Sequence, residues 1–398
     1  MSVRIAARVA FSVALAVLGL QPAPQSLALH ASADSGPRGI YIFPTPASVQ
    51  NGLYERAMAV HGVDGVAVVF DWSDLSPAGK PKVYDFTELD RRIALARAHQ
   101  LAVELVIEAG KGIPEWMFTP APAGLAAKRL AFVYSHHDGA GQPRPAVMPP
   151  PWDTIYQDAF GDMLQQVAAH LRGTGEIRDV SVVKLTGMNT LSEELRLPAQ
   201  TAAETGRQET ADSLAVWQRA GYRPKLVEAA FDGLTASFAR AFPGMMIALP
   251  IIMTNGFPPI DDHGQIVRGR AAKALQDDLL ETLLRHAAKA FPDHFVLQHD
   301  FLIADEPARP QAVALARSNR LPLAWQTNLL LGQSAAASGT FGNATPCNEE
   351  SFLRLLRNGI HPQGGTGPSE RARYIEVFPP DAIAFPTAIA TAHAELTR

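Results

Sequence analysis

Length, composition and charge exclude several classes of protein for this chain. It has 398 residues and a formal charge of −4, from 35 Lys and Arg against 39 Asp and Glu, and its basic residues are dispersed. Because no basic stripe is present to follow a phosphate backbone, we expect no nucleic-acid partner. Cys347 is the only cysteine, so internal disulfides are excluded and the core alone must stabilise the fold.

The first residues have the pattern of a secretory signal peptide. Arg4 and Arg8 precede an apolar stretch, Val9–Leu20, and the small residue Ala33 follows at a suitable cleavage position. The alternative is a membrane anchor, but the apolar stretch is shorter than the roughly 20 residues that span a bilayer. We therefore expect residues 1–33 to be removed and the mature protein to be secreted or periplasmic, with no membrane association.

The remainder, residues 34–398, shows no low-complexity linker and is expected to form one domain. Short runs rich in Val, Ile and Leu alternate with longer amphipathic stretches, which is the pattern of repeated βα units. The predicted strands are Gly39–Pro44, Val66–Asp71, Ala102–Glu108, Val180–Thr186, Met246–Pro250, Phe295–Asp300, Leu323–Thr327 and Tyr374–Phe378. Eight units predict the α/β fold class and a (β/α)8 TIM barrel. The alternative, an open doubly wound sheet, often has a glycine-rich first turn, which "FPTPAS" lacks.

The clearest predicted helix is Phe86–His99, which follows an expected capping box between Asp85 and Glu88. Its apolar face consists of Phe86, Leu89, Ile93 and Ala96. Long loops follow the third, fourth and seventh strands, at Ala109–Trp152, Gly187–Thr210 and Asn328–Cys347. In a barrel these loops share the C-terminal rim, where catalytic groups gather.

Polar residues within the apolar strands indicate which positions face the barrel interior, because successive side chains of a strand point to opposite faces. The positions expected to face inward are Glu104, Val106, Glu108, Val182, Lys184, Thr186, Gln298, Asp300, Ala324, Gln326, Tyr374, Glu376 and Phe378. Lys184 is expected to neutralise a carboxylate such as Glu104 or Glu376. These deep residues can also be read as a salt-bridge network that only fills the barrel. For Glu108, Asp300, Gln326 and Glu376, the position nearer the rim favours a functional role.

At this point the sequence resembles the clan A glycoside hydrolases among the sugar-processing TIM barrels. The segments that carry the resemblance, between Gly39 and Asp381, are "GVAVVFDWSDLSP", "YDFTELDRRIALARAHQLAVELVI", "GIPEWM", "PPPWDTIYQDAFGDMLQQVAAHL", "TGMN", "AWQTN" and "YIEVFPPD". The resemblance implies an exported protein that cleaves a glycosidic bond in an oligo- or polysaccharide with paired carboxylates.

The chain departs from the pattern of that clan at both expected catalytic glutamates. The clan places an Asn-Glu pair at the end of strand four and a glutamate at the end of strand seven. Asn189 is present here, but Thr190 and Gln326 stand at the glutamate positions. In one reading the acid/base has moved to Glu194, with Glu376 or Asp300 as its partner, and we take Glu194 and Glu376 as the expected pair. Only one of the adjacent Glu193 and Glu194 would face the cleft if the segment were extended.

Other residues at the same rim are expected to contact the sugar. The expected polar contacts are Asp71, Glu108, Asn189, His299, Asp300 and Gln326. Trp72 and Trp325 are expected to form stacking surfaces, with Trp116 and Trp152 as further aromatic residues near strand ends. Tryptophans can equally be core residues, and for Trp152 packing is the favoured reading. A second reading of the whole chain is a carbohydrate-binding barrel that has lost catalysis.

No metal or cofactor is expected. His136, His137 and Asp138 lie together, and His299 precedes Asp300, but neither group has the spacing of a known metal motif. The glycine cluster "QGGTG", residues 363–367, precedes a strand rather than opening a helix, so it does not predict a phosphate cradle.

Overall fold

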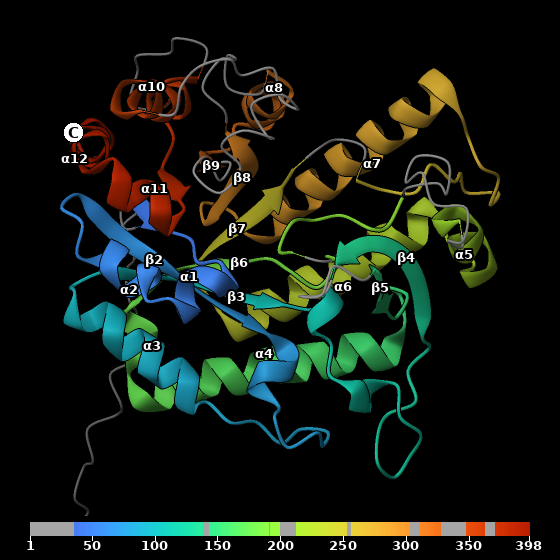
Figure 1. The fold of residues 1–398 in the computed structure, drawn as a ribbon. Coiled ribbons are helices and arrows are strands. Elements are labelled where there is room, and N and C mark those ends of the chain that lie inside the picture. Colours follow the sequence, from blue (N-terminus) through green and yellow to red (C-terminus); the bar gives the residue numbers. More distant parts are fainter. Residues whose placement is uncertain are drawn as a thin grey trace, which may run out of the picture. The chain divides into compact units, whose positions relative to one another are not determined.

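The central element of the structure, a computed structural model, is a closed barrel of eight parallel strands in the order β1-β10-β9-β8-β7-β6-β3-β2 (Figure 1). The structure describes residues 36–137, 143–190, 192–199, 212–252, 256–302, 310–327, 348–362 and 371–398. The barrel strands are β1 (Gly39–Ile42), β2 (Val63–Asp71), β3 (Ala102–Glu108), β6 (Val180–Lys184), β7 (Met246–Ile251), β8 (Phe295–Leu302), β9 (Leu323–Thr327) and β10 (Tyr374–Val377). All eight predicted strands are confirmed, and so is the (β/α)8 barrel.

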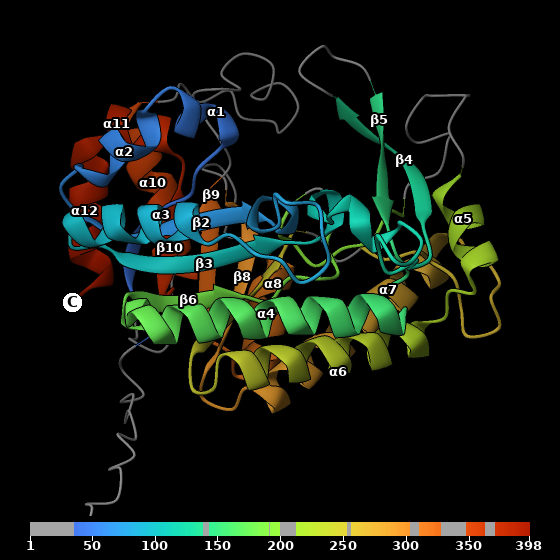
Figure 2. The same cartoon turned by 90° about the horizontal axis from the view of Figure 1, so that it is seen from below.

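Helices follow every strand of the barrel. They are α1 (Pro46–Gln50), α2 (Leu53–Met58), α3 (Thr87–Ala98), α4 (Thr154–Thr174), α5 (Ser213–Ala220), α6 (Pro224–Ala241), α7 (Gly269–Ala290), α8 (Pro310–Asn319), α10 (Glu349–Ile360), α11 (Pro379–Ala384) and α12 (Pro386–Leu396). The long helices α4, α6 and α7 are neighbours on one side of the barrel (Figures 1 and 2). No helix in the described part of the chain is long and apolar enough to cross a bilayer.

The helix α3 begins differently from the expected capping box. Its N-cap is Phe86, and the Oδ1 atom of Asp85 accepts a hydrogen bond from the backbone N–H of Thr87, 2.9 Å away. The carboxylate of Glu88 instead forms ion pairs with Arg91 and Arg92. The helix was predicted correctly, but the capping box was wrong because the N-cap is Phe86, which puts Glu88 at N2 rather than at the N3 position that a capping box requires.

The loop after β3 contains structure that the sequence pattern did not predict. The loop first forms two three-residue 3-10 turns, η2 (Gly110–Gly112) and η3 (Glu115–Met117). It then forms an antiparallel hairpin of β4 (Leu130–His137) and β5 (Pro143–Met148). Two further 3-10 turns are η1 (Trp72–Leu75) after β2 and η4 (Glu176–Arg178) before β6. The expected signal peptide, Cys347 and the "QGGTG" segment lie outside the described residues, as do parts of the rim at 200–211, 253–255, 303–309 and 328–347.

Two apolar clusters fill parts of the barrel interior. The larger consists of Tyr41, Val182, Met246, Ala248, Val296, Ala324 and Tyr374. The second consists of Phe43, Ala67 and Val106, with Val69 and Phe378 packed against it. The alternation argument is confirmed, since Glu104, Lys184 and Glu376 are fully buried on the same inward parity. The strands therefore hold charged groups inside an otherwise apolar barrel.

Candidate functional site: a carboxyl cluster around Lys184

Lys184 is the centre of the polar cluster inside the barrel. It is the last residue of β6, and its side chain is completely buried. Its Nζ atom lies 2.7 Å from Glu376 Oε1 on β10 and 3.4 Å from Glu193 Oε1 in the loop after β6. The ring of Phe43 faces the same ammonium group, with its centroid 4.5 Å from Nζ. One cation therefore joins strands from opposite sides of the barrel sheet.

Gln326 holds two of these carboxyl groups together. Its Nε2 atom donates to Glu376 Oε2 at 2.7 Å and to Glu193 Oε1 at 3.0 Å, which uses both protons of the amide. The sequence resemblance matched Gln326 to a glutamate of the clan. As an amide, Gln326 donates to both carboxyl groups, which an ionised glutamate could not do.

A second layer of contacts continues from Glu376 into the lower barrel. The Tyr374 hydroxyl donates to Glu104 Oε1 on β3 at 2.9 Å and to Gln298 Oε1 at 2.6 Å. Burial raises the pKa of Glu104 well above its usual range, and the charge of Glu376 raises it further. Both effects favour the protonated form of Glu104.

Asp300 completes the cluster at the C-terminal end of β8. Its Oδ1 atom accepts a hydrogen bond from Gln298 Nε2 at 2.7 Å, while its Oδ2 atom is buried and has no hydrogen-bond partner among the described residues. Burial raises the pKa of Asp300 well above its usual range; Lys184 opposes this, and Glu193 adds to it. Asp300 is the register partner of Gln326 on the neighbouring strand β9.

The charges of the cluster hold one another in unusual protonation states. Burial raises the pKa of Glu193, and the attraction of Lys184 only partly offsets this effect. Burial by itself would lower the pKa of Lys184, but the surrounding carboxyl groups, first of all Glu104 and Glu376, raise it well above its usual range. The surrounding carboxyl groups therefore hold the lysine in its charged form.

The loop after β6 presents Glu193, rather than Glu194, to Lys184 and Gln326. Both glutamates are buried, and Glu194 accepts a hydrogen bond from the Ser192 hydroxyl through Oε2. The backbone is bent at residues 192–195, so the alternation of an extended strand does not apply there. The expectation that only one of the pair would face the cleft was made for an extended segment, so the structure does not test it. Glu193 was missed as a member of the cluster.

The loop is fixed to its neighbours by backbone hydrogen bonds. Leu195 N–H donates to the carbonyl of Pro250 at 2.8 Å, and Leu197 N–H donates to the carbonyl of Gly256 at 2.7 Å. Asn189 holds the other side: its Oδ1 accepts from the Gly187 N–H, and its Nδ2 donates to the Ser192 carbonyl. Both ends of the Asn189 side chain are thus used within the loop. In this structure Asn189 therefore fixes the loop, and its expected role in binding sugar hydroxyls stays a prediction.

Glu376 is present where the sequence predicted it, but its surroundings differ from those of a substrate-facing carboxylate. The side chain is fully buried, and its two oxygens are bound by Lys184 and Gln326. A catalytic carboxylate must reach the scissile bond. In this structure Glu376 instead anchors the cluster from below.

Trp72 and Trp325 do not form the expected stacking surfaces. Both side chains have zero exposure. The Trp72 ring packs edge-on against Trp116, 5.5 Å away, under the η1 turn. A Cβ atom on Gly359 of α10 would lie 3.2 Å from Trp325, so Trp325 packs between the sheet and α10. The prediction was wrong because successive side chains of a strand point to opposite faces. Since Gln326 points into the barrel, its neighbour Trp325 points outward.

The other predicted contacts divide between the two faces of the sheet. His299 has the outward parity, with its ring 5.8 Å from that of Trp325, so its expected contact with sugar is not supported. Asp71 and Glu108 are register partners at the ends of β2 and β3, on the inward parity near the rim. Trp152 packs against aromatic neighbours, its ring 5.9 Å from that of Trp217, as the packing interpretation predicted.

One group of residues in the described part of the chain has the composition of a metal site. Asp90, His170 and Glu176 place their ligand atoms within 4.8 Å of one another. They belong to α3, α4 and η4, away from the Lys184 cluster. The side chains of His136 and His137, and the whole of Asp138, lie outside the described residues.

Comparisons with known proteins show the fold. No family model matches the chain, and no curated protein matches its sequence. The catalytic domain of β-amylase from Paenibacillus polymyxa is similar in structure, with a TM-score of 0.58 and 12% identity, over 90% of this chain and 97% of that one. Xylanase 10B from Thermotoga maritima gives a TM-score of 0.47 and 11% identity, over 87% and 84% of the two chains. The chain therefore shares the (β/α)8 TIM-barrel fold of that β-amylase domain.

Proposed function

We propose that the protein is an exported glycoside hydrolase that cleaves a glycosidic bond in an oligo- or polysaccharide at the C-terminal rim of the barrel. The observation that carries the proposal is the gathering of carboxyl groups around a single lysine. The cluster contains Glu104, Glu193, Glu194, Asp300 and Glu376 around Lys184. One ammonium group cannot balance five carboxylates, so protonated and ionised carboxyl groups coexist at neutral pH, as this hydrolysis requires.

Asp300 is the proton donor in this proposal. Its raised pKa keeps the proton on the carboxyl group, and its Oδ2 atom has no hydrogen-bond partner among the described residues. It stands at the C-terminal end of a barrel strand, where side chains from different strands meet a substrate. A neutral carboxylic acid held in this way can protonate the departing sugar oxygen.

Glu194 is the second carboxylate. Glu194 is 7% exposed, whereas Glu376 is 0% exposed. The charge of Glu194 also lies near enough to Asp300 to raise the pKa of Asp300. Ser192 fixes the Glu194 carboxylate through a hydrogen bond. Glu376 then positions the cluster with Lys184 and Gln326, although the sequence had suggested it as the partner of Glu194. Asp71 and Glu108 at the same rim supply hydrogen-bonding groups for sugar hydroxyls.

The test is sugar release from a panel of polysaccharides by the native chain and its variants. Glu194→Gln and Asp300→Asn should each lower the rate at least about 100-fold, the usual contribution of a positioned acid or base. Glu281→Gln, an exposed glutamate on α7, is the matched control and should keep the native rate. If the Glu194 and Asp300 variants cleave like the native chain, the assignment is wrong.

A second candidate is a barrel that binds carbohydrate without cleaving it. The observation in its favour is that Gln326, at the clan's nucleophile position, is fully used in holding Glu376 and Glu193. If the native chain cleaves nothing but binds oligosaccharides in a titration, this candidate replaces the hydrolase.

Export is tested separately. In a secreting bacterial host, N-terminal sequencing of the mature protein should begin at Asp34, one residue after the predicted cleavage position Ala33. An N-terminus at Met1 would contradict the signal peptide.

A further inference from the structure

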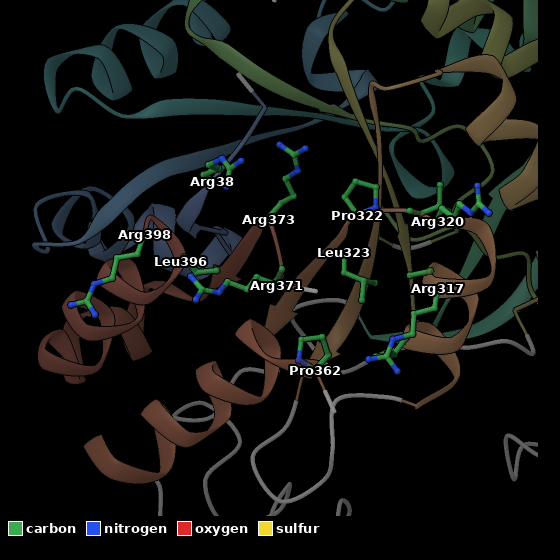
Figure 3. A pocket seen from close by; sticks show the side chains of 14 residues that line it. Arg38, Arg317, Arg320, Pro322, Leu323, Pro362, Arg371, Arg373, Leu396 and Arg398 are labelled. Carbon is green, nitrogen blue, oxygen red and sulfur yellow. The ribbon is translucent and has the colours of Figure 1, made fainter. Parts of the chain in front are cut away.

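A pocket lies at the end of the barrel opposite to the carboxyl cluster. Figure 3 shows the side chains that line this pocket. Its cavity volume is about 750 Å³. Arg38 precedes β1, Pro322 precedes β9 and Arg373 precedes β10, and the strands are parallel. The pocket is therefore at the N-terminal face, whereas Lys184 ends its strand at the other face. Its size is within the range of about 300–1,000 Å³ that small-molecule sites occupy.

The pocket is strongly cationic. The arginines that line it are Arg38, Arg317, Arg320, Arg371, Arg373 and Arg398. No acidic side chain is among its lining residues in the part of the chain that the structure describes. The chain as a whole has a charge of −4, so this concentration of positive charge runs against the average of the protein. Like charges brought together repel one another, and an anion in their midst removes that repulsion.

Helix ends explain only part of this set. Arg317 lies in the last turn of α8, Arg320 follows that helix, and Arg398 follows α12, where cations complement the negative end of a helix dipole. Arg320 also has a φ of 55°, in a position where glycine or asparagine is usual. Arg371 and Arg373 precede a strand instead, so the helix dipole gives no reason for them.

Arg371 supplies the contact that points to a ligand. Its Nη1 atom donates to the carbonyl of Glu395 at 3.2 Å, which fixes the guanidinium group at the edge of the pocket. Its Nε atom is buried and has no hydrogen-bond partner among the described residues. The pocket is therefore lined by an arginine whose position is fixed, and charged guanidinium N–H groups form strong hydrogen bonds with the oxygens of an oxyanion.

The remaining walls of the pocket are apolar. They are formed chiefly by Val313, Leu321, Leu323 and Leu396, together with Pro322 and Pro362. Figure 3 shows Leu323 and Leu396 on either side of Arg371. Guanidinium groups bind phosphate and sulfate oxygens in pairs, while apolar walls favour an organic body attached to the anion.

We propose that this pocket binds a phosphate- or sulfate-type oxyanion, carried either by a free organic ester or by a lipid headgroup. The site is separate from the proposed sugar-cleaving centre, which is at the other face of the barrel. The ligand's oxygens face Arg371 and the arginines around it, and its organic part lies against Leu323 and Leu396.

Isothermal titration of the purified chain with inorganic pyrophosphate at low salt tests the free-anion form. Flotation with phosphatidylglycerol vesicles, compared with phosphatidylcholine vesicles, tests the lipid form. Arg371→Gln and the exposed Arg320→Gln should each weaken binding by about tenfold, the effect of one charge-assisted contact. Arg285→Gln on α7, away from the pocket, and Glu194→Gln at the other face should leave binding at the native level.

Saturable binding of pyrophosphate that both pocket variants weaken supports a free anion, and binding of phosphatidylglycerol vesicles alone supports a lipid headgroup. The proposal is overturned if neither probe binds, or if binding is the same in both pocket variants as in the native chain. Because Arg320 is exposed, Arg320→Gln keeps the test valid even if Arg371→Gln fails to fold.

Discussion

Lys184 Nζ and Glu376 Oε1 form an ion pair of 2.7 Å in which both side chains are completely buried. Removing two charges from water is costly, and their attraction offsets this cost only when further hydrogen bonds complete the pair. Gln326 supplies such a bond to the other oxygen of Glu376. The pair is thus fixed from both sides, and the remaining carboxyl groups of the cluster depend on the same lysine.

Lys184→Met should therefore destabilise the fold strongly. Removing one partner of a buried pair typically costs about 3–5 kcal/mol, because the other charge is left buried without compensation. Urea denaturation measures the free energy of unfolding. Lys273→Met is the matched control, since the Lys273 and Asp277 side chains are 63% and 38% exposed, and it should cost less than about 1 kcal/mol. Equal losses in the two variants would contradict the buried pair.

The raised pKa of Asp300 predicts a pH dependence of stability. In the folded protein this pKa lies well above the ordinary value of 3.8, so the folded state keeps a proton that the unfolded chain releases. The contribution of this group is complete below that ordinary value and is lost as the pH rises through the folded pKa. Asp300→Asn is neutral at every pH. As the pH rises from about 4 to 8, the free energy of unfolding of Asp300→Asn should fall less than that of the native chain. Urea denaturation at each pH measures both values.

The control for this prediction is Asp85, whose pKa is shifted in the opposite direction. Asp85 is exposed, and a hydrogen-bonding contact with Thr87 lowers its pKa, so its contribution is present at neutral pH and is lost as the pH falls through the folded pKa. Asp85→Asn should leave the slope between about pH 4 and pH 8 as in the native chain. A pH-independent difference between the native chain and Asp300→Asn would contradict the assignment of the buried proton.

The sequence predicted the barrel and the inward parity because both depend on short-range regularities. Alternation placed Glu104, Lys184 and Glu376 inside, and the structure has them there. The same rule already turned Trp325 away from the interior, so its expected sugar contact conflicted with information in the strand itself. A large aromatic residue near a strand end signals burial as readily as binding.

The order of Glu193 and Glu194 could not be predicted in the same way. Their segment is bent, and its path depends on hydrogen bonds from Leu195 to Pro250 in β7 and from Leu197 to Gly256 in the loop after β7, both distant in sequence. Tertiary contacts of this kind leave no periodic pattern in a single chain. The role of Gln326 as a donor to two carboxyl groups likewise depends on strands that only the closed barrel brings together.

Trp325→Ala tests the outward placement of that ring. Removing a fully buried indole between the sheet and α10 should cost about 3–5 kcal/mol in urea denaturation, through lost contacts and the cavity left behind. The affinity of the folded variant for an oligosaccharide should equal that of the native chain, because the ring does not face the rim. A loss of affinity of about tenfold or more, as expected for a stacking platform, would restore the original interpretation.

Gly110→Ala tests whether the loop after β3 holds the loop that carries Glu193. Gly110 has a φ of 41°, and a Cβ atom there would lie 2.3 Å from the carbonyl oxygen of Thr190. Gly79 is the matched control, since its φ of 62° carries the same left-handed strain but a Cβ atom would meet nothing within 4 Å. Gly79→Ala should cost about 1 kcal/mol in urea denaturation and leave sugar binding unchanged.

Gly110→Ala adds a backbone clash to that strain, so it should cost clearly more than Gly79→Ala and displace the loop after β6. Displacement moves Glu193 away from Lys184, which leaves the ammonium group with fewer acceptors and weakens binding or cleavage of the sugar together with stability. Urea denaturation and oligosaccharide titration measure the two effects on the same samples. If Gly110→Ala lost stability without any change in sugar binding or cleavage, the contact between the two loops would contribute to stability only. Lys184 and Gln326 would then hold Glu193 in place without that contact.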